Sequence, residues 1–151
     1  MNPDFRWDLT PIYEDAEAWK RGYEEAESAV QALDALPGTL CYSEDHLKAG
    51  LDMIFNAQEK VERVYAYAFL QKSSDNGTPE HQEMEARAVR LLVALETATA
   101  FVNPEILSIP TEMLELWLQK EELAKYGHIA RDIARGRSHT LDAGGERLLA
   151  M

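Results

Sequence analysis

Four histidines are the residues of this chain whose type best suits metal binding: His46, His81, His128 and His139. A helix presents two ligands to one metal ion when they lie three or four residues apart, and no two of these histidines have that spacing. The segment 81–85 shares part of the His-Glu-x-x-His zinc motif, but its glutamate is displaced and its second histidine is absent. The sequence therefore predicts no zinc ligands, and the histidines are interpreted as surface polar residues.

Di-iron helical bundles use a different spacing, in which a glutamate precedes a histidine by three residues. The residues at that position before the four histidines are Ser43, Thr78, Lys125 and Gly136. None of them is a carboxylate, so this second kind of metal site is also not predicted.

Carboxylates are abundant, but their arrangement does not favour acid–base catalysis. They form adjacent pairs at 14–15, 24–25 and 121–122, and adjacent side chains point apart on a helix. None of these pairs lies inside an apolar stripe that would raise the pKa of a carboxyl group. We interpret them as solvated faces.

Nucleophilic and phosphate-binding motifs are likewise missing from the sequence. Gly144-Gly145 lacks the further glycines and the preceding strand of a phosphate loop, and there is no Gly-x-Ser-x-Gly segment. Cys41 is the one cysteine, which excludes an intrachain disulfide and a zinc site built on thiolates. A lone thiol at such a loop is more often a partly buried filler than a nucleophile. The sequence predicts no catalytic, cofactor-binding or metal-binding residue.

Aromatic residues offer the remaining candidate for binding. Tyr65, Tyr67 and Phe69 lie on one predicted helix, with Tyr67 on the opposite side from the other two. Such a pattern is usually core plus a helix–helix contact, and a peptide-binding groove is the smaller alternative.

Composition limits the classes of protein to which the chain can belong. Its 151 residues, 46% of them hydrophobic, predict a single domain over residues 1–151 with a sizeable core. The formal charge of −12 repels nucleic acid and anionic membrane surfaces, so neither is an expected partner. The first residues show no secretory signal, and we expect no membrane-spanning stretch. With its single cysteine, the chain is expected to be cytoplasmic.

Helical periodicity predicts the elements that position these residues. Apolar residues recur every three or four positions over 16–36, 43–72 and 78–102, again from about 111, and more weakly beyond 127. Asp15, Ser43 and Thr78 are the predicted N-caps, Pro37-Gly38 is a stop, and Asn103-Pro104 interrupts the third helix. No run alternates as a strand does. We predict an all-α, antiparallel multi-helix bundle of about five helices, with a further helix starting at Thr140.

The predicted faces of these helices carry the candidate core. On the first helix they are Trp19, Tyr23, Ala26, Val30, Leu33 and Leu36, and on the second Leu47, Leu51, Ile54, Gln58, Val61, Tyr65, Ala68 and Phe69. On the later helices they are Met84, Ala88, Leu91, Leu92, Leu95, Ala98, Thr99, Val102, Met113, Leu114, Trp117, Leu118, Ile129 and Ile133.

The N-terminus combines several large apolar residues with a helix-start signal. In Trp7-Asp8-Leu9-Thr10-Pro11-Ile12-Tyr13, Thr10 as a cap followed by Pro11 predicts a short turn that directs Trp7, Ile12 and Tyr13 towards apolar surface. We call residues 7–13 the N-terminal clasp, because this arrangement would pin the N-terminus to the helical body.

The clasp and five later segments together resemble the N-terminal domain of oligoendopeptidase F, a zinc metallopeptidase family related to thimet oligopeptidase. The segments occur in the family's order along nearly the whole chain. After the clasp they are 36–40 (Leu-Pro-Gly-Thr-Leu), 64–68 with 72–75 (Val-Tyr-Ala-Tyr-Ala, Lys-Ser-Ser-Asp), 97–101 (Thr-Ala-Thr-Ala-Phe), 104–107 (Pro-Glu-Ile-Leu), and Tyr126, Ile133 and 139–141.

This resemblance implies a cytoplasmic enzyme that hydrolyses short peptides with zinc held by a His-Glu-x-x-His helix and a downstream glutamate. None of those residues is present in this sequence, so the resemblance implies a non-catalytic chain that forms part of the wall of the substrate channel. Its expected partners are the downstream catalytic domain of the same polypeptide and, for the parent enzyme, oligopeptides. Self-association through a surface that the missing domain would cover is a further hypothesis.

An unrelated reading remains open beside the resemblance. An acidic helical adapter with Trp117 and Tyr67 in an exposed groove would need no downstream domain. Continuation of the reading frame past Met151 into a His-Glu-x-x-His segment distinguishes the peptidase from the adapter. A metal-binding helical bundle is disfavoured by the histidine spacings.

Overall fold

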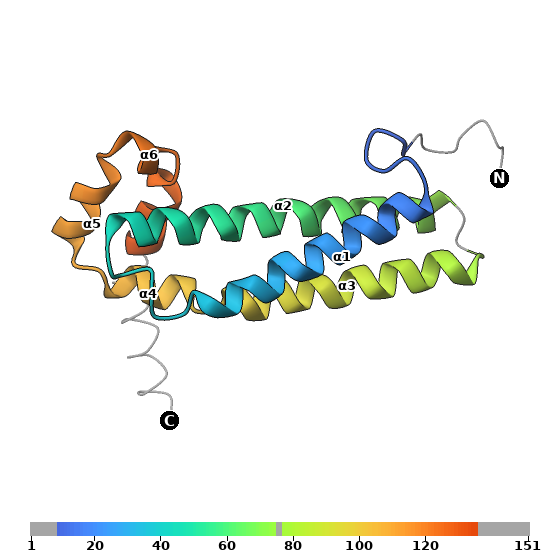
Figure 1. Ribbon diagram of the computed structural model, residues 1–151, viewed down its shortest axis with the longest axis horizontal. Helices are drawn as coiled ribbons and strands as arrows, with labels where there is room; N and C mark the ends of the chain where they lie inside the picture. The colour runs from blue at the N-terminus through green and yellow to red at the C-terminus, as the bar shows by residue number, and fades with distance from the viewer. Residues whose placement is uncertain (1–8, 75–76, 136–151) are drawn as a thin grey trace, which may run out of the picture. The chain divides into compact units, whose positions relative to one another are not determined.

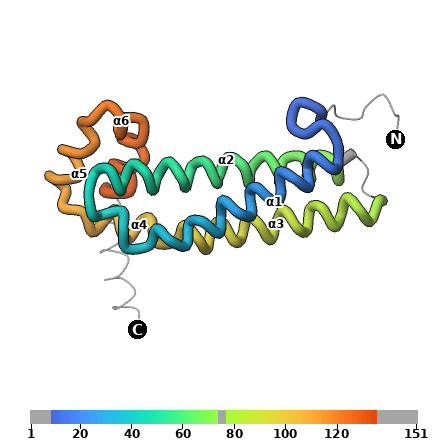
Figure 2. The backbone as a smooth tube through the Cα atoms, in the orientation of Figure 1, coloured from blue at the N-terminus to red at the C-terminus, as the bar shows by residue number. Residues whose placement is uncertain are grey.

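The computed structural model describes residues 9–74 and 77–135, which are helical except for turns and loops (Figures 1 and 2). The helices are α1 (Ala16–Ala32), α2 (Glu44–Ser74), α3 (Pro79–Thr99), α4 (Val102–Ser108), α5 (Thr111–Leu118) and α6 (Glu121–Ala124), with a 3-10 turn η2 at Leu33–Ala35. Residues 127–135 are helical as well. These ranges contain no strand, and the predicted all-α class is confirmed. The helix predicted from Thr140 lies outside the described residues.

These residues gather into two compact units, each built from two separate stretches of the chain. Within the described residues, the first unit comprises 9–35, 52–74 and 77–100, and the second comprises 36–51 and 101–135. Helix α2 contributes its beginning to the second unit and, from Asp52 onward, the rest to the first. One domain over 1–151 stays a prediction, because compact units are not by themselves domains.

The first unit is formed by α1, α3 and the part of α2 that begins at Asp52. Its largest fully buried side chain is Trp19 of α1, which is 1% exposed and donates its Nε1–H to the Val64 carbonyl of α2 at 3.0 Å. The Arg87 guanidinium of α3 lies 5.5 Å from the Trp19 ring and 4.4 Å from that of Tyr23. Trp19 therefore contacts both other helices of the unit, and it fills the space between them.

Local sequence signals explain where the helices begin. Asp15 accepts a hydrogen bond from the Ala18 amide at 2.8 Å, and the Ser43 hydroxyl accepts one from the His46 amide at 3.2 Å. Both caps satisfy amides that a helix cannot pair internally. Thr78 is the N-cap residue of α3 with Pro79 as the first helical residue, although its side chain makes no cap hydrogen bond. All three predicted starts are confirmed.

Two details of the predicted helices are wrong. The third helix ends at Thr99, and Pro104 lies inside the first turn of a new helix, α4, rather than at the break. A proline fits there because the first-turn amides have no partner within the helix. On α2 the predicted face includes Tyr65 and Phe69, but Phe69 is 47% exposed and the buried residues of that half are Ala57, Val61, Val64, Tyr67 and Ala68.

Residues 79–108, which hold α3 and α4, are long and apolar enough to cross a membrane. The mean hydropathy of their most apolar 18-residue segment is 1.2. This corrects the prediction that no stretch reaches such a length. The signal is weak evidence for a span, because core helices of globular proteins also produce it. Here α3 buries Ala88, Leu91 and Leu95.

The N-terminal clasp is confirmed over its described part, Leu9 to Tyr13. The Leu9 carbonyl accepts hydrogen bonds from the amides of Ile12 and Tyr13, which closes a turn that begins one residue before the predicted cap, Thr10. The Tyr13 ring meets the buried Tyr67 edge-on at 5.5 Å, and Arg63 of α2 donates to the Ile12 carbonyl at 3.0 Å. A side chain at Gly22 would lie 2.5 Å from the Tyr13 ring, so the glycine makes room for it. Trp7 lies outside the described residues.

The second unit is built from α4, α5, α6, residues 127–135, the loop before α2 and the first turns of α2. Its largest fully buried side chains are those of Leu40, Leu47, Ile106, Ile109, Leu114 and Leu123. Gly38, at the predicted helix stop, has a φ of 85°, which side-chain-bearing residues rarely adopt. Leu40 in turn fits directly over Gly50 of α2, where an added Cβ would come within 2.3 Å of its side chain.

Candidate functional site

A groove in the second unit is the candidate binding site. It is a hollow of about 670 Å³ that is open to solvent, and it is lined by Tyr42, Ser43, Glu44, Leu116, Trp117, Gln119 and Lys120. Its walls come from the loop and first turn of α2 on one side and from α5 on the other. Tyr42 is 68% exposed and Leu116 is 63% exposed, so the groove presents apolar surface beside polar groups. Such a mixture suits a peptide side chain with both characters.

An ion pair between the two walls sets the polarity of the groove. The Lys120 ammonium donates to the Glu44 carboxylate at 2.7 Å, and both residues also line a neighbouring hollow of about 320 Å³. The hydrogen bond to Glu44 and its negative charge raise the pKa of Lys120 above its usual 10.5. Because Lys120 is exposed, this pair joins the walls without adding much stability.

Ser43 and His46 form a contact that superficially matches a nucleophile with its base. The Ser43 hydroxyl oxygen lies 2.8 Å from the His46 Nδ1 atom. The same oxygen accepts the His46 amide hydrogen bond that caps α2, and the His46 ring lies edge-on against Tyr42 at 5.4 Å. A catalytic pair also needs a group that orients the base and donors for an oxyanion. No described contact supplies either, so this pair is a helix cap.

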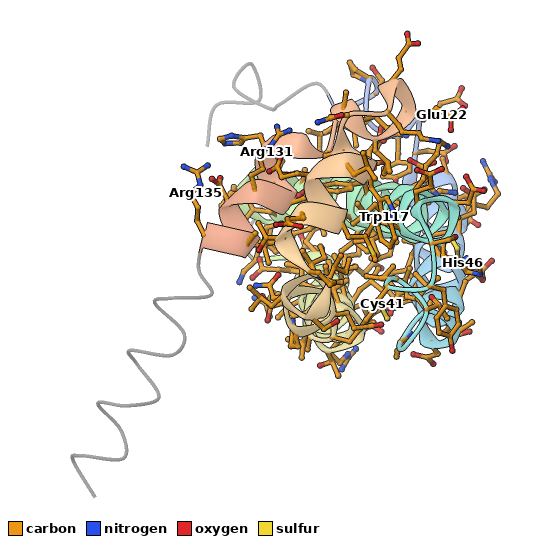
Figure 3. All side chains as sticks on the ribbon, turned by 90° about the vertical axis from the view of Figure 1, so that its left-hand side faces the viewer. Cys41, His46, Trp117, Glu122, Arg131 and Arg135 are labelled. Atoms are coloured by element: carbon orange, nitrogen blue, oxygen red, sulfur yellow. The ribbon has the colours of Figure 1, made fainter. Side chains whose placement is uncertain are left out.

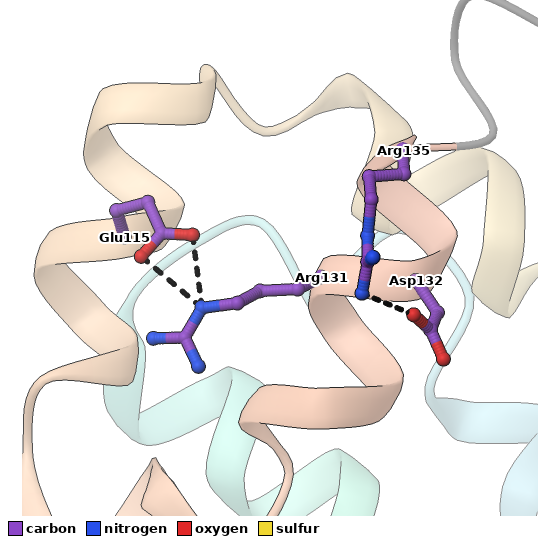
Figure 4. Close-up of polar contacts among 4 residues, drawn as sticks. All are labelled: Glu115, Arg131, Asp132 and Arg135. Atoms are coloured by element: carbon purple, nitrogen blue, oxygen red, sulfur yellow. Dashed lines mark hydrogen bonds and ion pairs between the residues drawn. The ribbon is translucent and has the colours of Figure 1, made fainter.

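Of the two ion pairs in Figure 4, one holds the wall provided by α5 and the other lies within residues 127–135. The Arg131 Nε atom, from residues 127–135, donates to both carboxylate oxygens of Glu115 at 3.1 and 3.2 Å. Arg135 pairs with Asp132 one turn away on its own helix. The first contact joins two elements of the unit, and it fixes the side of α5 that lies away from the groove-lining Trp117.

The structure disperses the histidines. His46 lies in the first turn of α2, His81 in the first turn of α3, and His128 pairs with Asp132 at 3.2 Å. His139 and Gly144-Gly145 lie outside the described residues. In residues 9–74 and 77–135 no group of three or more histidine, cysteine, aspartate or glutamate side chains could hold a metal ion. The acidic pairs at 14–15, 24–25 and 121–122 are all exposed.

The lone cysteine and the aromatic candidates differ in how exposed they are to solvent. Cys41 is exposed, which corrects the expectation of a partly buried filler (Figure 3). Trp117 lines the groove as the adapter hypothesis requires, but Tyr67 is only 4% exposed and belongs to the core of the first unit. Sequence reasoning missed Tyr42 and Leu116. Leu116 breaks the apolar periodicity of α5, and that break was the available signal.

Comparison with known proteins adds an identity to this geometry. The Oligopeptidase F family profile matches residues 105–151. Over 95% of its length the chain is 34% identical to oligopeptidase PepF of Bacillus subtilis, and it covers 22% of that protein. It is 29% identical, again over 95% of its length, to a plasmid-borne oligoendopeptidase F of Lactococcus lactis, and it covers 24% of that protein.

Solved structures agree on the fold. The chain matches the crystal structure of an oligoendopeptidase-F from Enterococcus faecium with a TM-score of 0.75 and 25% identity, over 90% of this chain and 27% of that one. A putative peptidase from Chlamydophila abortus gives a TM-score of 0.78 at 24% identity, over 99% of this chain and 26% of that one, and supports the fold alone.

The chain thus spans about a quarter of the length of the proteins that it matches. The family profile and the named relatives point to the same assignment. The chain belongs to the oligopeptidase F family, in which it corresponds to the N-terminal part of much longer proteins.

Proposed function

We propose that this chain is the non-catalytic N-terminal part of a zinc-dependent oligoendopeptidase that hydrolyses short peptides in the cytoplasm. The observation that carries the proposal is the match of 95% of the chain to proteins named oligopeptidase and oligoendopeptidase F. Their names describe cleavage within oligopeptides. The single exposed cysteine, a free thiol, suits the reducing conditions of the cytoplasm.

The zinc ion of such an enzyme does not fit the described residues of this chain. Zinc in a catalytic site takes three protein ligands and a water. His46, His81 and His128 lie in separate surroundings, and no triple cluster exists among the described residues. We therefore assign no step of hydrolysis to this chain, and we place the zinc ligands in the downstream part of the polypeptide.

The role proposed for the chain is to form part of the wall of the substrate channel. A wall must keep its shape, and the first unit has the means: the buried Trp19 bridges its helices, and the clasp fixes its N-terminal end. A narrow channel of this kind would admit flexible oligopeptides and exclude folded proteins. The downstream catalytic part and the oligopeptide substrates are the proposed partners.

The experiment compares two polypeptides: the 151-residue chain, and the polypeptide that continues past Met151 in the reading frame. We expect the longer one to cleave a fluorogenic short peptide, to lose that activity with a chelator and to regain it with zinc. The shorter one should not cleave the peptide. Cleavage by the 151-residue chain alone, or a folded longer polypeptide with no chelator-sensitive activity, would contradict the proposal.

A stand-alone adapter is the second candidate function, and the groove of about 670 Å³ beside Trp117 is the observation that favours it. An adapter should bind an apolar or cationic peptide as the 151-residue chain, with a change in Trp117 fluorescence. Trp117→Ala should abolish this binding, and Tyr65→Ala, outside the groove, should leave it intact. A reading frame that stops after Met151 would favour this alternative.

A further inference from the structure

One side of the α2–α3 hairpin in the first unit carries four apolar side chains that are exposed or half-buried. Phe69 of α2 is 47% exposed, and Val89 and Val93 of α3 are 41% and 55% exposed. Tyr65 is half-buried and stacks on Phe69, with ring centroids 5.9 Å apart. We call Tyr65, Phe69, Val89 and Val93 the outer patch.

The register of the hairpin places these four side chains together. Lys72 of α2 and Glu85 of α3 pair at 3.2 Å, which aligns the two helices near their connection. Phe69 lies three residues before Lys72, and Val89 lies four residues after Glu85, so both lie on the side of the hairpin that carries this pair. Because α2 and α3 run antiparallel (Figure 1), Tyr65 and Val93 follow one turn further along the same side.

This side differs from the one that α1 covers. The residues of α3 that are buried in the unit are Ala88, Leu91 and Leu95, and they lie on another side of the helix from Val89 and Val93. Helix α3 therefore has two apolar sides, of which the described residues cover one. This second apolar side also explains the composition of residues 79–108. The stretch is as apolar as a membrane span, yet only 17% of its most apolar 18-residue segment is buried.

Single exposed apolar residues are ordinary, but a contiguous group that includes two aromatic rings marks an interaction surface. Two observations indicate its occupant. The proteins that this chain matches continue for about three times its length beyond the matched region, because the chain covers only 22–27% of them. The formal charge of −12 on each chain opposes close approach of a second copy.

We propose that the outer patch is a docking surface for the part of the polypeptide that follows residue 151 in the full-length protein. The contact is apolar at its centre, and Lys72 and Glu85 at one end provide charged groups for its rim. The proposal shares with the proposed function the existence of a longer polypeptide, but it requires no peptidase activity.

The test measures the accessibility of a thiol placed in the patch. Cys41→Ser removes the exposed native thiol, and Val93→Cys or Ala94→Cys then introduces a new one. Ala94 is the matched control, because it is also exposed but lies about 100° around α3 from Val93. Maleimide labelling is followed by peptide mass in the 151-residue chain and in the longer polypeptide, so that thiols elsewhere do not interfere.

In the 151-residue chain we expect both thiols to react at similar rates. In the longer polypeptide the Val93→Cys thiol should react at least about tenfold more slowly than in the 151-residue chain. The Ala94→Cys thiol should keep its rate. Equal rates for Val93→Cys in both polypeptides would overturn the proposal. Slowing in the 151-residue chain that increases with concentration would also overturn it, since a second copy would then be the occupant.

Val89→Asp is a second variant with a separate readout. It should leave the unfolding midpoint of the 151-residue chain nearly unchanged, because Val89 is exposed there, and it should lower that of the longer polypeptide. An equal shift of the unfolding midpoint in the 151-residue chain and in the longer polypeptide would contradict docking. A longer polypeptide that protects Val93→Cys but cleaves no peptide would refute the proposed function and leave the docking surface standing.

Discussion

At the scale of single residues, Tyr13 shows how one side chain connects the N-terminus to the first unit. Its ring lies against Tyr67, beneath the Arg63 guanidinium at 5.4 Å, and over the bare backbone of Gly22. Burial raises the pKa of the Tyr13 hydroxyl above 10.0, with Arg63 acting in the opposite direction and Glu25 adding to the rise. The neutral ring is therefore the form that the fold favours.

Stability should depend on pH through this residue. Because the pKa of Tyr13 is raised on folding, its contribution is fully present below pH 10.0 and is lost as the pH rises through the raised value. Tyr13→Phe should remove this residue's part of the stability that is lost at alkaline pH. Urea unfolding from pH 8 upward measures the free energy of unfolding. Tyr42→Phe, at an exposed site, is the control and should leave the alkaline profile unchanged.

Glu105 is a partly buried residue whose carboxylate we expect to lower the stability of the fold. Both of its carboxylate oxygens are shielded from solvent, and neither has a hydrogen-bond partner among the described residues. Glu105→Met replaces the carboxylate by an apolar group of similar length, and we expect it to increase the free energy of unfolding by about 1–3 kcal/mol. Chemical denaturation measures the change, and the exposed Glu112→Met should give a much smaller one. Destabilisation by Glu105→Met would show that the carboxylate has a compensating contact.

At the scale of elements, the helix starts could be predicted from the sequence, and the buried face of α2 could be predicted only in part. Asp15 and Ser43 act on amides within three residues, so a local pattern suffices to find them. Along α2, the predicted residues Leu47, Leu51, Ile54, Val61 and Ala68 are buried. In the part that begins at Asp52 and belongs to the first unit, Val64 and Tyr67 are buried as well, and Phe69 is exposed. A single stripe drawn along 31 residues misplaces Tyr65 and Phe69 for that reason.

The groove could be predicted only in part for a related reason. Trp117 attracts attention by its type alone, whereas Tyr42 is a wall residue only because α5 lies beside the start of α2, where Lys120 contacts Glu44. That contact joins residues 76 positions apart, and no local pattern records it.

The clasp and α1 should respond together to substitution. Gly22→Ala favours the helix by about 1 kcal/mol through propensity, but the added Cβ would displace the Tyr13 ring. We expect a smaller gain, or a loss, in the native sequence and the full gain in a Tyr13→Ala background. A double-mutant cycle from urea unfolding measures the difference. Equal gains in both backgrounds would show that the clasp does not press on α1.

At the scale of the whole molecule, the discontinuous units make a prediction about truncation. A chain of residues 1–77 keeps α1 and α2 but lacks α3, so Trp19 loses Arg87 and its apolar neighbours. We expect it to unfold without cooperativity, while residues 1–100 unfold cooperatively. Both fragments contain Trp7 and Trp19 and lack Trp117, so their fluorescence can be compared directly. Cooperative unfolding of the shorter fragment would contradict the described core.

The order in which these units become complete has a consequence during synthesis. Among the described residues, the first unit needs the chain up to residue 100, and the second needs residues 36–51 together with residues 101–135. Helix α1 therefore leaves the ribosome with Trp19 exposed and must wait for α3, more than sixty residues later, before that ring is covered. At elongation rates of about 5–20 residues per second this wait lasts several seconds. A nascent chain of this family should therefore attract a chaperone early, before α3 has been made.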